Sequence, residues 1–357
     1  MNSPASGYLP YLDVTRIVAV LGVVGVHVIG GGVDAHEVGI ATVALHMALK
    51  AAVPIFFMMS GALSLAPRAQ RQGPGEFLRR RARRIVPALV IWSAFYLVVV
   101  RGAISGAPVE SFGELMDLLV SGETYTHLYF LFAIAGLYLI TPVLASFLSE
   151  DEGRRSWVVG LIAAVWTVLT VSASQAGGRG IISTVPLTAG TLTFFLLYAC
   201  YYVLGRAVLV APIPRSAAVV GLLLCPALVV GVTYVYVNST GGLEGNAPVE
   251  PWASVLAPLY GSLPVVVYSV TLMASVSSLC RRWRVSERTE STLRTLGEAT
   301  FGIFLVHFAV LVILRSMFPE LQNYDAGPVA VTWTVTVLVS TVIALAGKRT
   351  PLLRVIF

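Results

Sequence analysis

Apolar residues follow one another along this chain in long runs, which are interrupted only by short polar segments. An α-helix needs about 20 mainly apolar residues to cross the hydrocarbon core of a bilayer. None of the runs shows the period-two alternation of a membrane-spanning β-strand. The pattern therefore predicts an all-α integral membrane protein with about ten transmembrane helices. The runs cover 12–31, 40–66, 85–103, 127–148, 156–174, 187–210, 216–238, 252–279, 296–317 and 328–347.

The second run is long for a single span, and Pro54 is expected to bend it because proline disrupts a helix interior. Composition agrees with a chain whose surroundings are largely lipid. Hydrophobic residues make up 57% of the 357 residues and charged residues 12%, whereas about 25% of a soluble domain is charged. A soluble enzyme, a secreted disulfide protein and a disordered protein are therefore excluded. The three cysteines have no metal-ligand spacing and are predicted to be small packing residues.

The basic residues lie mainly on one side of the predicted membrane. Nineteen of the 24 lysines and arginines fall in or beside the loops at 67–84, 149–155, 211–215 and 280–295, or at the C-terminal end. The loops between these are acidic. Because lysine and arginine are retained on the cytoplasmic side, both termini are predicted to be cytoplasmic, which an even number of spans also requires. The net charge of +6 then reflects topology, and no nucleic-acid partner is predicted.

Ionisable residues inside the first span are the clearest candidates for chemistry. A charged side chain at the centre of a span costs about 2.5–3.5 kcal/mol on insertion scales, so it needs a reason. Arg16 and His27 are eleven residues apart, which places them on one helix face about 16 Å apart along the axis. Asp13 lies one turn before Arg16, within pairing distance. The shared face predicts a cavity. The alternatives are that Arg16 reaches the headgroups with Asp13 as counter-ion and that His27 is a packing residue.

Other buried polar residues are given secondary roles. His307 either belongs to a site or hydrogen-bonds between helices. His46 and Lys50 are four residues apart and face one direction, and Lys50 is a candidate for lining the cavity. His127 stands at the outer entrance to its span, where we expect a contact with lipid headgroups. The histidines lack the spacing of a metal site, so no metal is predicted.

Arginines are unusually dense just before the third predicted span, at 79–84. Topology together with contact to anionic lipids explains the side on which this cluster lies. It does not explain the density. Planar guanidinium groups bind phosphate in a bidentate manner, so a phosphorylated ligand is the functional interpretation.

Five segments in chain order resemble the membrane-bound acyltransferase-3 family. Each motif is short, but together they extend over roughly 8–345, in an order and topology that match. Tyr129 departs from the pattern, because the family usually has tryptophan there. The segments are Leu12–Arg16 followed ten residues later by His27, Val53–Gly61, Phe77–Pro87, His127–Pro142 and Phe301–His307.

The resemblance implies a single transmembrane acyltransferase domain over 8–345, followed by a short cytoplasmic tail over 346–357. The family moves an acyl group, commonly acetyl, from cytoplasmic acyl-CoA to a hydroxyl of a glycan or of a lipid-linked acceptor. The donor substrate implied here is therefore acyl-CoA, with acetyl-CoA as the first choice, and the setting is a bacterial inner membrane. By the same resemblance His27 is catalytic and Arg16 is the family's arginine. The residues implied to meet the CoA phosphates are Arg80, Arg81, Arg83 and Arg84.

The chemistry of the residues is compatible with that assignment. Acyl transfer to an alcohol needs a base for the hydroxyl proton, and histidine is partly neutral at physiological pH. Arg16, with Asp13 as its partner, either binds a pyrophosphate oxygen or polarises the thioester carbonyl. The sequence leaves the acceptor, the acyl chain length and a covalent acyl-histidine intermediate open. Two other functions stay open as well: a transporter of a polar or acylated molecule, and an enzyme that relays the acyl group across the membrane.

Overall fold

The structure is a computed structural model that describes residues 8–121, 124–148, 153–177, 193–351 and 353–357. Within these ranges every regular element is a helix and no strand is present, which confirms the predicted all-α class.

Nine helical segments in the described chain are long and apolar enough to cross a membrane. These segments begin with α1 (Pro10–Asp34), α2 (Ile40–Leu49) joined to α3 (Ala52–Ser64), α5 (Pro74–Phe95) continued by the π-helix η1 (Tyr96–Ile104), and α7 (Tyr129–Leu148). They continue with α8 (Arg154–Gly177), α11 (Arg215–Ser239), α13 (Leu263–Cys280), α14 (Glu287–Met317) and α15 (Ala326–Arg349).

The remaining predicted span, at 187–210, corresponds to α10 (Leu196–Val210), which has 15 residues and is shorter than the others. The part of this prediction at 187–192 lies outside the described residues. Short helices lie between the spans: α4 (Pro67–Gln70), α6 (Phe112–Ser121), α12 (Pro251–Val255) and η2 (Pro319–Gln322). A further short helix, η3 (Leu353–Val355), follows α15.

The second span is bent where its sequence requires it. Helix α2 ends at Leu49 and α3 begins at Ala52, so the break lies at Lys50 and Ala51. Pro54 has no N–H to donate, and its ring would clash with the carbonyl of residue 50 in a continuous helix. The bend predicted from Pro54 is thus confirmed, one turn before the proline itself.

The predicted span at 252–279 is not one helix, which corrects the sequence prediction. Helix α12 ends at Val255, and residues 256–262 form a non-helical segment before α13 begins. Two side chains from other helices satisfy carbonyls of this segment. The Tyr201 hydroxyl donates to the carbonyl of Tyr260, and Lys50 Nζ donates to the carbonyl of Pro258 at 3.0 Å. Irregular backbone is tolerated within a membrane protein when it is buried in protein in this way.

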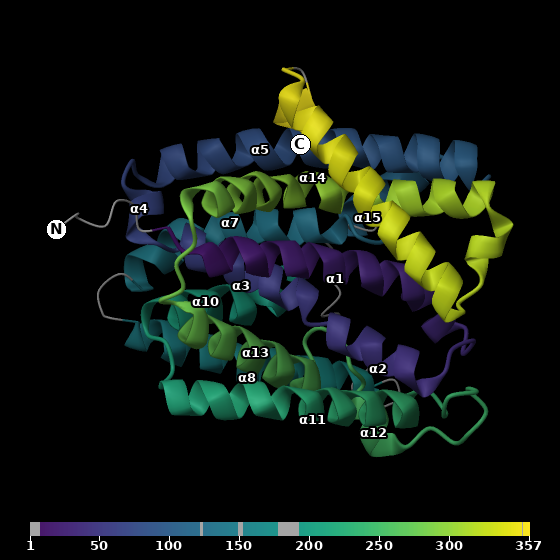
Figure 1. Ribbon diagram of the computed structural model, residues 1–357, viewed down its shortest axis with the longest axis horizontal. Coiled ribbons are helices and arrows are strands. Elements are labelled where there is room, and N and C mark those ends of the chain that lie inside the picture. The colour runs from purple at the N-terminus through teal and green to yellow at the C-terminus, as the bar shows by residue number, and fades with distance from the viewer. Residues whose placement is uncertain (1–7, 122–123, 149–152, 178–192, 352) are drawn as a thin grey trace.

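The spans run side by side along the long axis of the molecule, with α1 near the middle and α15 crossing obliquely (Figure 1). Helices α3 and α10 cross at especially close range. A Cβ on Gly61 would overlap the carbonyl oxygen of Tyr202, and one on Gly205 would overlap that of Met58. Two reciprocal glycines therefore allow the two backbones to touch, as small residues commonly do between membrane helices.

Large apolar side chains on the outer faces of the bundle are exposed. A soluble monomer rarely exposes wide apolar surface, so this surface fits contact with lipid. Examples on α8 and α11 are Leu161, Ile162, Val165, Leu169, Leu223 and Val230.

Candidate active site

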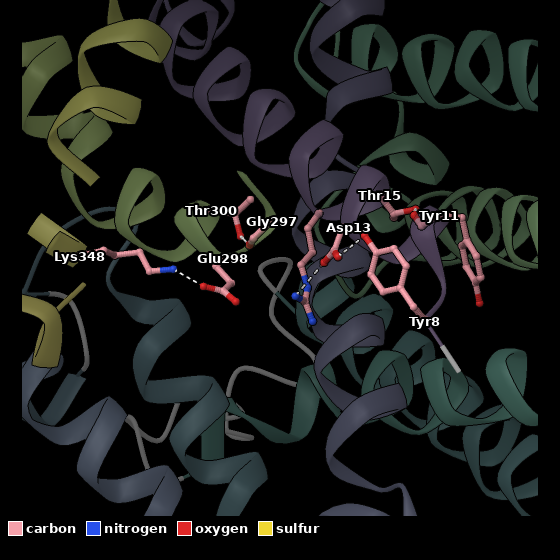
Figure 2. A network of polar contacts seen from close by, with 9 residues as sticks. Tyr8, Tyr11, Asp13, Thr15, Gly297, Glu298, Thr300 and Lys348 are labelled. Carbon is pink, nitrogen blue, oxygen red and sulfur yellow. Dashed lines mark hydrogen bonds and ion pairs between the residues drawn. The ribbon is translucent and has the colours of Figure 1, made fainter. Parts of the chain in front are cut away.

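The polar face of α1 begins with a short network of hydrogen bonds. Arg16 Nη1 lies 3.2 Å from Asp13 Oδ1, and the Tyr8 hydroxyl donates to Asp13 Oδ2 at 2.8 Å (Figure 2). Partial burial and the hydrogen bond to Asp13 raise the pKa of Tyr8 to about 12. Gly297 on α14 leaves room for the carboxylate, because a Cβ there would lie 2.7 Å from Asp13 Oδ1. Asp13 is thus fixed as the partner of Arg16, as the sequence predicted.

Arg16 opens onto a cavity of about 220 Å³ whose polar end is rich in arginine. Arg81 and Arg84 on α5 line the same cavity, so the structure brings three of the predicted arginines together. We call this the arginine cavity. Its apolar end is formed by Phe130 of α7 and Phe304 of α14.

Aromatic rings and one hydroxyl contact the two arginines of α5 that line this cavity. Arg81 donates to Ser64 Oγ at 3.0 Å, and its guanidinium lies 4.9 Å from the centre of the Tyr138 ring. Arg84 lies over the Phe301 ring at 5.0 Å. Cation–π contacts of this kind orient a guanidinium and leave its N–H donors available to a ligand. The arginine cavity thus presents oriented guanidinium groups, together with the carboxylate of Glu298.

Arg80 and Arg83, which the sequence grouped with them, line neither the arginine cavity nor the histidine cavity described below. Arg80 lies 3.8 Å from Glu76 and donates to the carbonyl of Ala69 at 3.2 Å. Arg83 is exposed. Residues three apart share a helix face, so Arg81 and Arg84 turn inward together while their neighbours point elsewhere.

A second basic pocket of about 380 Å³ adjoins the first at Arg16 and Leu63. It is lined in addition by Arg68 and Arg294, and the guanidinium of Arg294 lies 4.0 Å from the centre of the Tyr8 ring. From their place in the sequence, Arg68 and Arg294 are expected to contribute to topology only. Their approach to Arg16 depends on the packing of separate helices, which no sequence spacing indicates.

His27 lies in a cavity of about 160 Å³, which we call the histidine cavity. Phe130 and Phe304 line both this cavity and the arginine cavity, so the two cavities abut at these rings. The predicted cavity on the Arg16–His27 face of α1 is therefore present as two chambers. The histidine cavity is further lined by Thr126, His127, Tyr129 and Tyr260.

Two more histidines meet His27. The ring centroids of His27 and His307 are 5.3 Å apart, those of His27 and His127 are 6.3 Å apart, and those of His127 and His307 are 5.0 Å apart. The expectation that His127 contacts headgroups is wrong, because its side chain is 1% exposed and packs among protein rings. No group of histidine, cysteine or carboxylate side chains in the described chain is arranged to hold a metal ion.

His307 makes its hydrogen bonds in this structure within its own helix, so of the two roles left open by the sequence the inter-helix bond is not formed here. Its Nδ1 atom lies 2.7 Å from the carbonyl oxygen of Phe304 and 3.2 Å from that of Ile303, both on its own helix. Lys50 lines neither the arginine cavity nor the histidine cavity. Its hydrogen bond to Pro258 instead holds the 256–262 segment, whose Tyr260 faces the histidine cavity.

Tyr129, which replaces the tryptophan expected from the resemblance, lines the histidine cavity. Its ring packs 6.1 Å from that of Tyr198 and 5.6 Å from that of Phe194. The departure from the motif thus falls on a residue that shapes this cavity.

Comparison with known proteins agrees with this geometry. A family model described as an acyltransferase domain, that of the acyltransferase-3 family, matches residues 9–348. No curated protein and no solved structure matches the chain. The match covers nearly the whole chain and every residue that lines the arginine and histidine cavities, and nine segments of the described chain are able to cross a membrane. The chain therefore belongs to the acyltransferase-3 family and is an integral membrane acyltransferase.

Proposed function

We propose that this enzyme transfers an acyl group, acetyl in the first instance, from acyl-CoA to a hydroxyl, with His27 as the general base. The observation that carries the proposal is the pair of abutting cavities. One end offers Arg16, Arg81 and Arg84, and the other end offers His27. A donor with a phosphorylated head and a reactive thioester at the end of a long arm fits both ends at once.

The head of the donor is assigned to the arginine cavity. Its phosphates carry negative charge and cannot enter lipid, whereas guanidinium groups bind phosphate with charge-assisted hydrogen bonds. We place this cavity on the cytoplasmic side of a bacterial inner membrane, following the excess of basic residues in that set of loops. The uncharged arm of the donor then extends toward His27 and has to part the rings of Phe130 and Phe304, whose centroids are 5.2 Å apart.

The chemical step is a direct transfer. A ring nitrogen of His27 takes the proton of the acceptor hydroxyl as the oxygen attacks the thioester carbonyl. The new C–O bond forms, the C–S bond breaks, and His27 returns the proton to the leaving sulfur. The products are an ester and free CoA thiol. Burial of the cavity among rings keeps water from competing as the nucleophile.

The acceptor is assigned to the part of the histidine cavity lined by Thr126, Tyr129 and Tyr260. A hydroxyl-lined wall suits a polar acceptor, such as a sugar of a glycan or of a lipid-linked carrier. Tyrosine at 129 adds a hydroxyl to a flat ring, and a site that hydrogen-bonds its substrate discriminates strongly against acceptors that lack the matching group.

The test is release of free thiol from acetyl-CoA by the purified protein in lipid nanodiscs, with and without a pool of glycan acceptors. His27→Ala should abolish release that depends on the acceptor, and the protein should stay folded. His36→Asn is the matched control, because His36 lies on a loop with φ 59°, a conformation that asparagine tolerates. Full activity in His27→Ala would show that His27 is not the general base.

A further inference from the structure

One nitrogen of the His307 ring is fixed by its own helix. Nδ1 approaches the carbonyl oxygens of Phe304 and Ile303 at 2.7 and 3.2 Å. A carbonyl oxygen only accepts hydrogen bonds, so Nδ1 must carry the proton. In a neutral imidazole the other nitrogen then has a free lone pair. Backbone geometry therefore makes Nε2 of His307 a hydrogen-bond acceptor.

This acceptor has no partner. The His307 side chain is 0% exposed, and within the described chain Nε2 is buried without a hydrogen bond. A buried polar atom left unpaired costs about 1–3 kcal/mol. Almost all such atoms are satisfied in native proteins, so an orphan inside a candidate active site calls for a functional explanation.

The ring of His27 is the donor best placed to satisfy it. The two centroids are 5.3 Å apart with the planes inclined by 35°. A hydrogen bond of roughly 3 Å between nitrogens that each lie roughly 1 Å from their ring centres gives a centroid separation of about 5 Å. The rings are not hydrogen-bonded in this structure, and catalytic hydrogen bonds commonly tighten only when the substrate is bound.

His127 is slightly nearer to His307, at 5.0 Å between centroids, and in the described chain both of its ring nitrogens also lack a partner, but it is less free to turn. Its ring is stacked on Phe308 with 5° between the planes and meets the edges of Phe304 and Tyr96. Both histidines line the histidine cavity, and His27 meets Phe308 in a T-shaped contact at 5.0 Å and not in a stack. A small rotation of His27 is therefore sufficient, whereas His127 would have to leave a stack of aromatic rings.

We propose that His307 is the positioning residue for His27 and accepts a hydrogen bond from one of its ring nitrogens at Nε2. The inference rests on the proposed function, in which His27 is the base. A chain then runs from the carbonyl of Phe304 through His307 and His27 to the acceptor hydroxyl. The N–H of His27 that faces His307 keeps its proton throughout. The opposite nitrogen takes the hydroxyl proton and later delivers it to the sulfur, so His307 sets the tautomer of the base without touching substrate. This is the general arrangement in which a third group orients the base.

Two amide variants of His307 separate this role from a structural one. In His307→Gln the amide reaches the position of Nε2, so an acceptor toward His27 is retained. In His307→Asn the amide reaches only the position of Nδ1, so the bonds to the helix carbonyls are retained and the acceptor is lost. The proposal expects kcat to fall roughly 100-fold or more in His307→Asn but within about tenfold in His307→Gln. The KM for acetyl-CoA should be unchanged in both. A role limited to the helix carbonyls predicts the opposite order, which would overturn the proposal.

Nitrogen-15 NMR of histidine-labelled protein in nanodiscs provides a readout that does not depend on turnover. The resonance lost in His307→Gln identifies His307, which should show a protonated Nδ1 and an unprotonated Nε2. With CoA bound, the N–H resonance of His27 should shift in His307→Asn relative to wild type and should not shift in His127→Gln. A protonated Nε2 on His307, or a His27 resonance that responds to His127 alone, would refute the inference. Absence of all acyl transfer in wild type would instead refute the proposed function.

Discussion

Arg84 and Arg83 are neighbours on one helix that the structure places in different surroundings. Both are exposed, but Arg84 lines the arginine cavity over the Phe301 ring, whereas Arg83 lines neither cavity. Exchanging each for glutamine removes the same charge from adjacent positions. If the cavity holds the donor phosphates, only Arg84→Gln should weaken donor binding, since topology and lipid contact would depend on both.

The size of the effect follows from the contact that is lost. A hydrogen bond to a charged group contributes about 1.5–3 kcal/mol, and each 1.4 kcal/mol is a factor of ten. The Kd for CoA should therefore rise roughly 10- to 150-fold in Arg84→Gln and less than about twofold in Arg83→Gln. Arg84 is exposed, and Glu298, which lines the same cavity, is paired with Lys348 at 2.6 Å, which places the expectation toward the lower end.

The assay is titration of CoA into each variant in nanodiscs, together with the KM for acetyl-CoA. Acetyl-pantetheine, which carries the thioester but no phosphate, is the discriminating substrate. Its KM should be the same in wild type and in Arg84→Gln. If CoA affinity fell equally in Arg83→Gln and Arg84→Gln, the arginine cluster would be explained by membrane topology and not by phosphate binding. A raised KM for acetyl-pantetheine would show that Arg84 supports the fold of the cavity and does not bind phosphate.

Three further outcomes are expected from the structure. Gly61→Ala should destabilise by at least about 1–3 kcal/mol because its Cβ overlaps the carbonyl of Tyr202, whereas Gly231→Ala, with nothing within 4 Å, should be neutral or stabilising in thermal unfolding. Tyr129→Phe should raise the KM for the acceptor and leave the KM for acetyl-CoA unchanged. If only the KM for acetyl-CoA changed, the placement of the acceptor beside Tyr129 would be contradicted. The pKa of Tyr8 is raised to about 12, so its contribution to stability is lost as the pH climbs from 10 toward 12. In denaturant titrations, the free energy of unfolding should therefore fall less between pH 10 and pH 12 for Tyr8→Phe than for wild type. Equal falls in the two proteins would contradict this role of Tyr8.

Much of the architecture could be predicted because lipid leaves few alternatives. Every crossing segment must be apolar and must satisfy its own backbone, so the spans follow from hydropathy. The break at Lys50 follows from the clash that Pro54 imposes one turn earlier. The break at 256–262 had a signal in the sequence that hydropathy alone overlooks, because Pro258 and Gly261 both disfavour a continuous helix. The groups that satisfy its backbone, from Tyr201 on α10 and from Lys50 between α2 and α3, could not be predicted.

The site was predictable only where its residues share one helix. Arg16 and His27 lie on one face of α1, so their spacing alone indicated a common cavity. His127 and His307 reach His27 from a turn before α7 and from α14. No spacing rule connects positions so far apart in the chain, and their meeting depends on how the helices pack. The four arginines of α5 implied to bind CoA lie between these cases. Helical periodicity pairs Arg81 with Arg84 and Arg80 with Arg83, but it does not say which pair turns inward.

Phe130 and Phe304, which line both cavities, separate the charged arginine cavity from the histidine cavity. Charged arginines need water nearby or an anionic partner, whereas a histidine base works best where water is excluded. Arg16 and His27 are held about 16 Å apart on one rigid helix, and the Phe130 and Phe304 rings lie 5.2 Å apart where the cavities meet. Rings at this separation are packed against each other, so in the proposed function the arm of the donor has to displace them to reach His27. The donor phosphates would stay with the arginines, and this arrangement would hold the donor in one direction with its thioester at His27.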